Sequence, residues 1–307
     1  MKTGTLFRLN RALRIGLACA VAFGFAAGQT AFADLLVPLG DASGFTLLVT
    51  DGGINSSDSA FQNGNIGLAA AGFTYAQSGG AETNLQQPTN ALINTGSTVG
   101  AHPSGVTIVQ NSSTNAFLAQ AVTDATNESN ALAALTPTVT LGNVTSGETV
   151  TLLSGENVVS VGNIILNQAA LTLNAPAGAT IIVNVSGTIT LAGGSLGNGL
   201  RLAGGVTPDD VFFNILSSGT NVTTSGGGNA QDIQGTILDL QGSVGLHPGE
   251  VDGQIIAKDF SSSSGALVSP VSAPTVPDPS SIFLLATVLF FVGVLLRKRR
   301  VSTWPSL

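Results

Sequence analysis

Short runs of alternating apolar and polar residues fill the second half of the chain, from Thr138 onward. Side chains of a β-strand point alternately to its two sides, so each run predicts a strand with one side in a core. Gly, Asn, Ser and Pro separate the runs at intervals of roughly 8 to 12 residues, a spacing typical of all-β folds. The predicted strands begin close to Val150, Asn163, Ala170, Ile181, Thr188, Val211, Gly235 and Gly253.

Such strands fit a β-sandwich, a barrel or a β-solenoid, and three features favour the solenoid. Small residues fill the expected corners, where Asn and Gly tolerate positive φ. Aromatic residues make up only 5% of the chain, which suits thin stacked coils. The Asn-Gly pairs typical of tight hairpins occur only at Asn63-Gly64 and Asn198-Gly199. The predicted fold class is therefore all-β, a parallel β-helix-like solenoid, with a β-sandwich as the alternative.

One stretch, Asn115 to Leu135, has the periodicity of a helix instead of a strand. Its stripe recurs every three or four residues and consists of Leu118, Val122, Ala125, Ser129, Leu132 and Leu135. Ser113 or Thr114 is expected to cap the helix, and Pro137 to end it. A single amphipathic helix in such a chain must cover a β-face, so we expect it to lie along the solenoid.

The basic residues are concentrated at the two ends of the chain. Four lie within the first 14 residues, and the segment from Asp34 to Thr275 has two basic residues against sixteen acidic ones. Four more form a cluster near the C-terminus, Arg297, Lys298, Arg299 and Arg300. An acidic body argues against nucleic acid as a partner, because a nucleic-acid binder needs a basic face.

Residues 1–33 have the three parts of a secretory signal peptide. A basic region ends at Arg14, an apolar stretch follows, and Ala31 and Ala33 supply the small residues expected before a cleavage site at Asp34. The apolar stretch is about 20 Å long as a helix, too short for a hydrocarbon core of about 30 Å. Cys19, the only cysteine, lies in it, so the mature chain is predicted to have no disulfide and no thiolate metal site.

The C-terminus also has three parts: a Pro/Ser linker over 270–281, an apolar run with the basic cluster over 282–300, and a tail over 301–307. The run predicts a transient inner-membrane span whose basic cluster stays in the cytoplasm. The linker holds the motif Val276, Pro277, Asp278, Pro279 and Ser280. This layout resembles the PEP-CTERM sorting signal of Gram-negative bacteria, with Asp278 in place of the usual Glu. The resemblance implies processing by an exosortase and delivery to the cell surface or the extracellular space.

The body carries a second set of family motifs, in the stretches 63–68, 175–187, 202–214, 234–238 and 251–258. On these stretches, residues 45–268 resemble the choice-of-anchor A domain, an adhesive domain of bacterial surface proteins. The order of strands, helix and strands is also similar to that of ice-binding β-solenoids. The resemblance implies that 34–269 form one adhesive domain, and it marks no catalytic site.

The best lead to an enzyme is a formal G-x-S-x-G motif around Ser195. Asp209, Asp239 and His247 follow it in the chain order of an α/β-hydrolase triad. That motif needs a helix directly after the turn, and the Gly- and Pro-rich residues 198–208 do not favour one. A Gly-Ser corner between coils is the preferred interpretation, so no catalytic residue is predicted and the protein is not expected to be an enzyme.

No metal site is predicted from the sequence. His102 and His247 each precede a proline and are expected to be isolated loop residues, which are poor zinc ligands. The acids are scattered and form no calcium-loop motif, although calcium held by oxygens that converge across coils stays open. No other cofactor is expected.

Threonines recur at alternate positions in three places, 136/138/140, 149/151 and 188/190. Stacked on one face, they would form a flat surface for ice or sugar; alternatively they are ordinary strand residues. The sequence as a whole predicts an exported, exosortase-sorted adhesin or structural component of an exopolysaccharide or biofilm matrix, with a surface polymer as its partner. An ice- or sugar-binding solenoid and a serine hydrolase are the alternatives.

Overall fold

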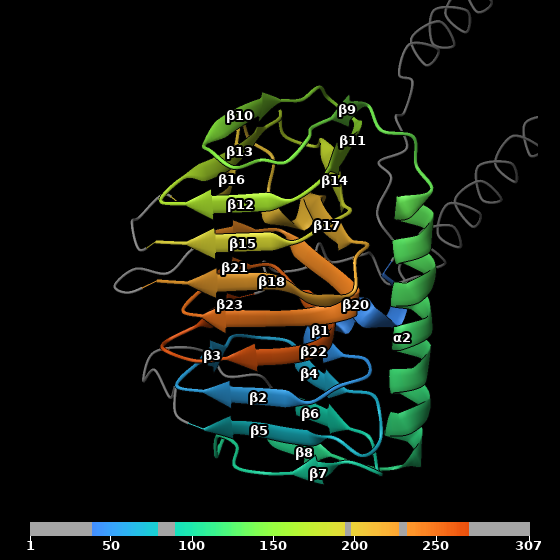
Figure 1. Ribbon diagram of the computed structural model, residues 1–307. Helices are drawn as coiled ribbons and strands as arrows, with labels where there is room; N and C mark the ends of the chain where they lie inside the picture. The colour runs from blue at the N-terminus through green and yellow to red at the C-terminus, as the bar shows by residue number, and fades with distance from the viewer. Residues whose placement is uncertain (1–38, 79–89, 194–197, 227–231, 270–307) are drawn as a thin grey trace, which may run out of the picture.

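The computed structural model describes residues 39–78, 90–193, 198–226 and 232–269 (Figure 1). Strands pair in parallel with the strands of the next coil, for example β11 (Glu156–Val161) with β14 (Thr180–Val185). Parallel pairing between successive coils defines a β-solenoid, so the prediction of a solenoid is confirmed. The β-sandwich alternative is wrong, because a sandwich is built from antiparallel strands.

Each complete coil has three strands, and the strands stack into three faces. The helix-covered face consists of β9 (Val139–Thr140), β11, β14, β17 (Val211–Ile215), the first parts of β20 (Thr236–His247) and β22 (Ile255–Ser262), β1 (Phe45–Val49), β4 (Asn65–Leu68), β6 (Asn90–Ile93) and β8 (Thr107–Val109). The open face consists of β12 (Ile164–Asn167), β15 (Ile189–Ala192), β18 (Gly219–Ser225), the second parts of β20 and β22, β2 (Ile54–Ser57), β5 (Thr74–Ser78) and β7 (Thr98–Val99).

The third face is a separate sheet, with seven strands among the described residues. It consists of β10 (Glu148–Thr151), β13 (Ala170–Asn174), β16 (Gly199–Ala203), β19 (Asp232–Gln234), β21 (Glu250–Asp252), β23 (Leu267–Ser269) and β3 (Ala60–Phe61). The short 3-10 helix η2 (Pro208–Asp210) leads from this face into β17. The chain therefore runs in each coil from the helix-covered face to the open face, then to the third face and into the next coil.

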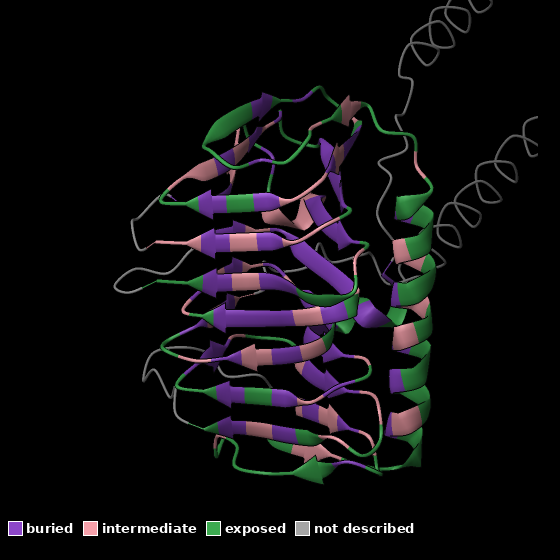
Figure 2. Cartoon of the chain, in the orientation of Figure 1, coloured by how far each residue is buried: buried purple, intermediate pink, exposed green. Residues whose placement is uncertain are grey.

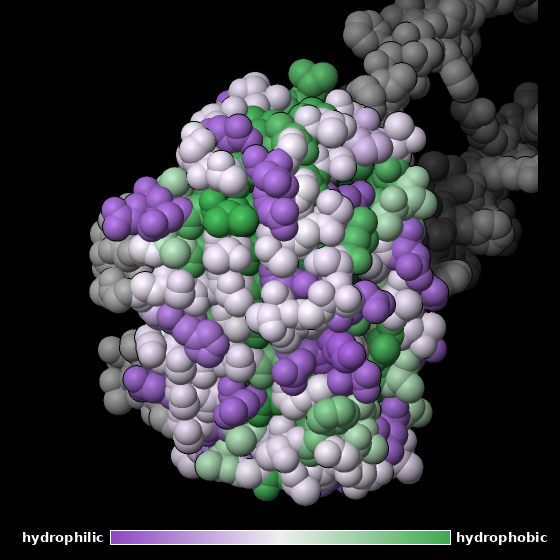
Figure 3. Space-filling model, viewed as in Figure 1, coloured by the Kyte–Doolittle hydropathy of each residue, from purple (hydrophilic) through white to green (hydrophobic). Residues whose placement is uncertain are grey.

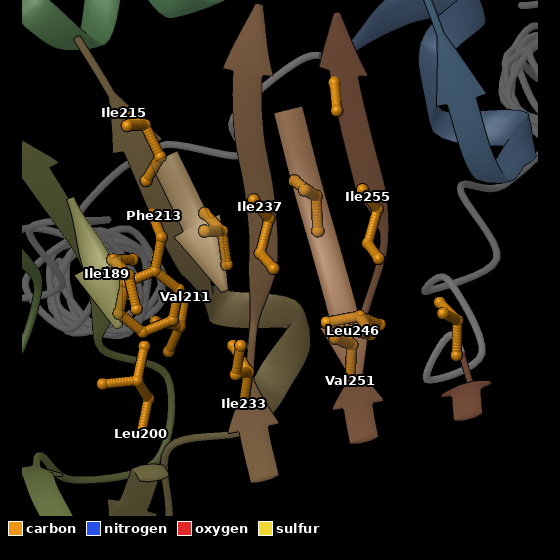
Figure 4. Packing of buried hydrophobic residues seen from close by; sticks show 14 of the residues in the cluster. Ile189, Leu200, Val211, Phe213, Ile215, Ile233, Ile237, Leu246, Val251 and Ile255 are labelled. Atoms are coloured by element: carbon orange, nitrogen blue, oxygen red, sulfur yellow. The ribbon is translucent and has the colours of Figure 1, made fainter. Parts of the chain in front are cut away.

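A single hydrophobic column fills the interior of the coils. Every second side chain of a strand points inward, as in β15, where Ile189 and Leu191 are fully buried and Thr190 and Ala192 are half-exposed (Figure 2). Figure 4 shows how Val211, Phe213 and Ile237 from successive coils pack against one another in this column. Because the mature chain has no cysteine by our interpretation of the sequence, this packing and the backbone ladders must supply its stability.

The helix α2 (Ser112–Ala133) lies along the stack and covers one face, as the sequence predicts (Figure 1). Its buried side includes Leu118, Ala121 and Ala125, which pack on a second apolar layer formed by outward side chains of the sheet. That layer includes Phe45, Leu48, Val158, Ile182, Phe212, Leu238 and Ile256. The helix-covered face is therefore buried on both sides, by the core within and by α2 outside.

The helix begins earlier and is capped differently than predicted. Asn111 is the N-cap, and its side-chain oxygen accepts a hydrogen bond of 2.9 Å from the backbone N–H of Thr114. The expectation of Ser113 or Thr114 as the cap is wrong, because Asn111 has the extended backbone that a cap needs and the next residues are already helical. Val122 is only half-buried, and Leu135 lies beyond the helix end.

The order of the coils in space differs from their order in the chain. Residues 45–109 form the coils at one end, and α2 then carries the chain along the stack to the other end, where β9 begins the remaining coils. The last strands return to the first ones: β22 pairs with β1 and β2, and β23 pairs with β3. The two ends of the described body therefore meet in the middle of the solenoid, along a seam between β22–β23 and β1–β3.

Candidate functional site: the open face

The open face presents outward side chains in columns that run across its paired strands, the longest over seven of them. The central column carries no charge and reads Ile165, Thr190, Thr223, Gly245, Ser261, Asn55 and Ala76. A second column includes Thr220, Ser243 and Asp259, and its far end includes Thr74 and Thr98. A third column includes Asn167, Ala192, Ser225 and His247. Parallel strands repeat at about 4.8 Å, so these columns form a regular array of small side chains.

Hydroxyl groups on this face bond to one another across neighbouring coils. Thr74 and Thr98 lie 2.8 Å apart between their side-chain oxygens, and Thr223 donates to Thr190 over 3.5 Å. In Figure 3, which views the molecule from this side, much of the surface has intermediate hydropathy, with smaller hydrophilic and hydrophobic patches. The face is therefore neither a charged patch nor an apolar patch, and it suits a ligand that accepts hydrogen bonds over a wide area.

His247 belongs to the open face and not to a loop. It is the last residue of β20, so the prediction of a loop position is wrong for this histidine, because the strand alternation continues up to Pro248. Its Nδ1 lies 2.8 Å from the hydroxyl of Ser263, and its Nε2 lies 3.4 Å from that of Ser261. His102, by contrast, follows β7 in a loop as predicted, and its ring stacks on Tyr75 at 6.4 Å between ring centres.

Asp239 and His247, the two described members of the hypothetical hydrolase triad, bond to different partners and not to each other. Asp239 is fully buried, and its Oδ1 accepts a hydrogen bond of 2.8 Å from the amide of Asn221, whereas the His247 ring bonds to serines on the surface. Burial raises the pKa of Asp239 to about 7, although the hydrogen bonds from Asn221 and from the backbone of Gly242 lower it. Ser195 lies outside the described residues. The described part of the triad therefore gives no support to a serine hydrolase.

The third face carries a cluster of acidic side chains, whereas the columns of the open face named above include one acid, Asp259. Asp232 pairs with Glu250 in register, and Gln234 with Asp252. Arg201 forms an ion pair with Asp232, and burial nevertheless raises the pKa of Asp232 to about 6. Burial and the neighbouring Asp252 also raise the pKa of Glu250. Within the described ranges, no group of three or more His, Cys, Asp or Glu side chains has a geometry that could hold a metal ion.

A shallow hollow of about 450 Å³ lies between α2 and the sheet that it covers. It is lined by Thr126, Ser129, Asn130, Ile215, Leu216, Ser218, Leu240 and Gln241. None of these side chains is an acid or a base at neutral pH, so the hollow offers no general acid or base for catalysis.

The predicted threonine stacks are split between two faces. Thr190 lies on the open face, whereas Thr149 and Thr151 lie on the third face. The hydroxyl of Thr138 bonds to the backbone of Val158 and serves the sheet itself. The hydroxyl array of the open face was therefore only partly visible in the sequence, because its members come from separate coils and are joined by pairing, not by spacing along the chain.

The export and sorting segments lie outside the described residues. These are the cleavage residues Ala31 and Ala33, the motif from Val276 to Ser280 and the cluster Arg297 to Arg300. Among the residues that the structure does describe, no helix is both long and apolar enough to cross a membrane.

The fold and the open face define a class of β-solenoid protein in which a helix covers one face of the coils and another face stays uncovered. Residues 21–267 match the family described as an ice-binding-like adhesive domain, and the chain belongs to that family. An adhesive domain of this family indicates an extracellular or surface protein.

Several solved structures share this fold. An ice-binding protein from an Arctic yeast is 24% identical, with a TM-score of 0.56 over 80% of this chain and 99% of its own. One from the Antarctic ascomycete Antarctomyces psychrotrophicus is 18% identical, with a TM-score of 0.53 over 76% and 98%. An ice-binding protein domain from Shewanella frigidimarina is 21% identical, with a TM-score of 0.51 over 76% and 97%. The comparison with curated protein sequences gives no match.

Proposed function

We propose that this protein is an exported, non-enzymatic adhesin or matrix component that attaches to an extended neutral polymer through its open face. Family membership supports an adhesive role, and the signals at both ends of the sequence support export. No cofactor is part of the proposal, and calcium enters only as a bridge to polymers that are themselves anionic.

The observation that carries the proposal is the uncharged central column of the open face, from Ile165 to Ala76. Hydroxyl, amide and methyl groups in a regular array match a polymer that offers hydroxyl groups along its length, such as a neutral polysaccharide. A solenoid binds through such a broad face and not through one pocket. The acidic third face would repel an anionic polymer, which favours a neutral one.

Ice is the second candidate ligand, and one specific observation favours it. The solved structures that share this fold are titled ice-binding proteins, from an Arctic yeast, an Antarctic ascomycete and Shewanella frigidimarina. A flat array of small uncharged side chains is also compatible with a crystal surface of ordered water. Ice and a neutral polysaccharide both offer O–H donors and oxygen acceptors over an extended surface. Only a direct comparison of the two ligands separates them.

Two threonine-to-glutamate substitutions, one on the open face and one on the third face as its control, test the role of the open face. Thr223→Glu places a charge in the central column, and Thr149→Glu makes the same change on the third face, where Thr149 is exposed. Burying the new carboxylate against a neutral ligand without a partner costs at least about 1.4 kcal/mol, so Thr223→Glu should weaken binding roughly tenfold or more. Thr149→Glu should bind like the unchanged protein.

The ligand is identified by running two assays with the same three proteins. Co-sedimentation with insoluble neutral glucan tests the polysaccharide, and thermal hysteresis with inhibition of ice recrystallisation tests ice. Loss of either activity in Thr223→Glu alone identifies that ligand at the open face. Equal losses in both variants, or binding that neither variant changes, would contradict the assignment of the open face.

The proposed fate of the chain rests on its C-terminal sequence. An exosortase would recognise Pro277, Asp278 and Pro279 while the following apolar run pauses in the inner membrane, and the body would then stay at the cell surface or enter the matrix. Mass spectrometry of the mature protein tests this route. A product that begins at Asp34 and ends before Leu307 is expected, and a product that still ends at Leu307 would contradict processing, although not export.

A further inference from the structure

The hollow beside α2 lies where two neighbouring coils turn from the helix-covered face onto the open face. One coil makes this turn at residues 216–218, between β17 and β18, and the next makes it at residues 240–241, within β20. Directly after the two turns, Thr220 pairs with Ser243 in the second column of the open face. The hollow is therefore next to the open face, at the edge where α2 begins to cover the coils.

Side-chain hydrogen bonds hold the two turns in one arrangement. The amide of Asn221 donates to the carbonyl of Ser217 and to Oδ1 of Asp239, each over 2.8 Å, and so joins the two coils. A side chain at Gly242 would collide with this amide, so the close approach of the coils requires glycine there. Because the turns are fixed in advance, a ligand that enters the hollow orders little of the protein and loses little affinity to entropy.

Two buried asparagines hold the wall that α2 contributes to the hollow. Asn214 donates to the backbone carbonyl of Ser129 over 3.0 Å and accepts a hydrogen bond of 2.6 Å from the hydroxyl of the same serine. Asn184, in the neighbouring coil, donates to the carbonyl of Leu132 over 2.8 Å. Buried amides need such partners, and these bonds fix the position of α2 against the sheet at the hollow.

The lining combines apolar side chains with neutral polar ones. Leu216 is 43% exposed, which is unusual for a leucine among the described residues, and it lines the hollow together with Ile215 and Leu240. The exposed side chains of Asn130, Ser218 and Gln241 bring amide and hydroxyl groups to the same space. These groups both donate and accept hydrogen bonds, and the lining carries no charge for an ionic ligand to pair with.

A neutral sugar ring has the same combination of groups. The C–H groups of a pyranose present an apolar surface, and its hydroxyls donate and accept as the amides of the hollow do. The volume of about 450 Å³ lies within the range of about 300–1,000 Å³ that is typical of small-ligand sites. We propose that the hollow is a sugar-binding site, which takes a terminal or branch unit of a neutral polysaccharide. The link to a polymer on the open face rests on the proposed function, whereas the site itself rests on its own lining.

Nuclear magnetic resonance of the isotope-labelled mature protein tests the site with three soluble probes, cellotriose, maltotriose and mannotriose. At least one of them should shift the backbone amide signals of residues 216–218 and 240–242. Asn130→Ala and Gln241→Ala each remove one hydrogen-bonding amide and should weaken binding roughly three- to tenfold. Asn127→Ala, at an exposed position of α2 outside the lining, is the matched control and should bind like the unchanged protein.

No shift with any of the three probes, or shifts confined to other parts of the surface, would overturn the sugar site. Equal affinities of Asn130→Ala, Gln241→Ala and the control would also overturn it. Thr223→Glu separates this proposal from that of the open face, because it should leave binding of the trisaccharide unchanged. Trisaccharide binding at the hollow without binding of insoluble glucan would contradict the open face alone. Glucan binding that Thr223→Glu weakens, without any trisaccharide shift, would contradict the hollow alone.

Discussion

The helix-covered face and the open face are built from the same coils, and β20 and β22 run through both. Inward side chains are alike on the two faces, since both contribute to one hydrophobic column. Outward side chains differ: Leu48, Ile182 and Leu238 project toward α2, whereas Thr190 and Thr223 project toward solvent. The two faces therefore differ in their outward side chains. Apolar outward side chains pack against a helix, and polar ones leave the face exposed to solvent.

This difference is visible in the burial of individual strands. β14 and β17 on the helix-covered face are buried at every position, whereas β2 and β15 on the open face are buried at every second position. A strand buried on both sides is nearly continuous in apolar residues, and a strand with one free side alternates. The polar residues at alternate positions of its strands thus explain why the open face has no covering helix.

Removal of a contact beneath α2 should have the largest effect on stability. Leu118 is fully buried between the helix and the sheet, so Leu118→Ala should lower the free energy of unfolding by about 2–5 kcal/mol. Thr223→Ala, the matched truncation on the open face, should change it by no more than about 0.5 kcal/mol. Urea unfolding followed by circular dichroism measures both, and similar losses would show that the two faces are not as different as their burial indicates.

Asp239, at the corner between the two faces, should make the stability of the protein depend on pH. Asp239 lies in β20 between the part that pairs with β17 and the part that pairs with β18, and its pKa is about 7 in the folded chain against an ordinary 3.8. Because folding favours the protonated form, its stabilising contribution is complete below about pH 4 and is lost as pH rises through 7. This rise of about three units in the pKa of Asp239 corresponds to a loss of at most roughly 4 kcal/mol in the free energy of unfolding between low and high pH.

The variant Asp239→Asn sharpens this prediction. It keeps an oxygen that accepts from Asn221 and removes the charge, so it should be more stable than the unchanged protein at pH 8 and should flatten the profile between pH 4 and 8. Unfolding in urea at several pH values measures this. Asp51→Asn, at an exposed position, serves as the control and should keep the original profile. A profile in Asp239→Asn that matches the original would assign the dependence to other acids, such as Asp232.

Loss of the helix cap should have the smallest of the three effects. Asn111→Ala removes the acceptor for the Thr114 N–H and should cost about 1 kcal/mol, whereas Asn111→Ser keeps a capping oxygen and should restore most of it. Thermal unfolding of the three proteins measures the difference. Equal stability of the alanine and serine variants would mean that packing on the sheet alone fixes the start of α2.

Local patterns predicted those elements that have a strong periodicity of their own. The alternating runs near Ala170 and Thr188 correspond to β13 and β15, and the helical stripe placed α2 within three residues at each end. The first strands of the body were harder, because β1 is buried throughout and lacks alternation. The seam could not be predicted from the sequence, because the pairing of Leu47 with Ile255 depends on the order of the coils in space.

The sequence predicted a strand with exposed hydroxyl groups, but it did not predict which strands lie beside it. Threonines at 188 and 190 indicated a hydroxyl-bearing strand, but the partners of Thr190 are Thr223 and Ile165 in other coils, at separations that no motif fixes. His247 was assigned to a loop because Pro248 follows it, although the strand extends up to that proline. A face of this kind becomes recognisable only when the register between coils is known.

The seam has a consequence for how the body reaches its native state. The hydroxyl of Thr50 donates to the carbonyl of Ala257, across 207 residues of chain. Until β22 arrives, β1 has β4 beside it but nothing on its other edge, so the coils formed by residues 45–109 end in an unpaired strand throughout synthesis. Closing so long a loop costs entropy before any contact compensates it, and folds dominated by such pairings form slowly. The final closure therefore requires the complete body, and β1 keeps one unpaired edge until residues 255–269 are available to pair with the first coils.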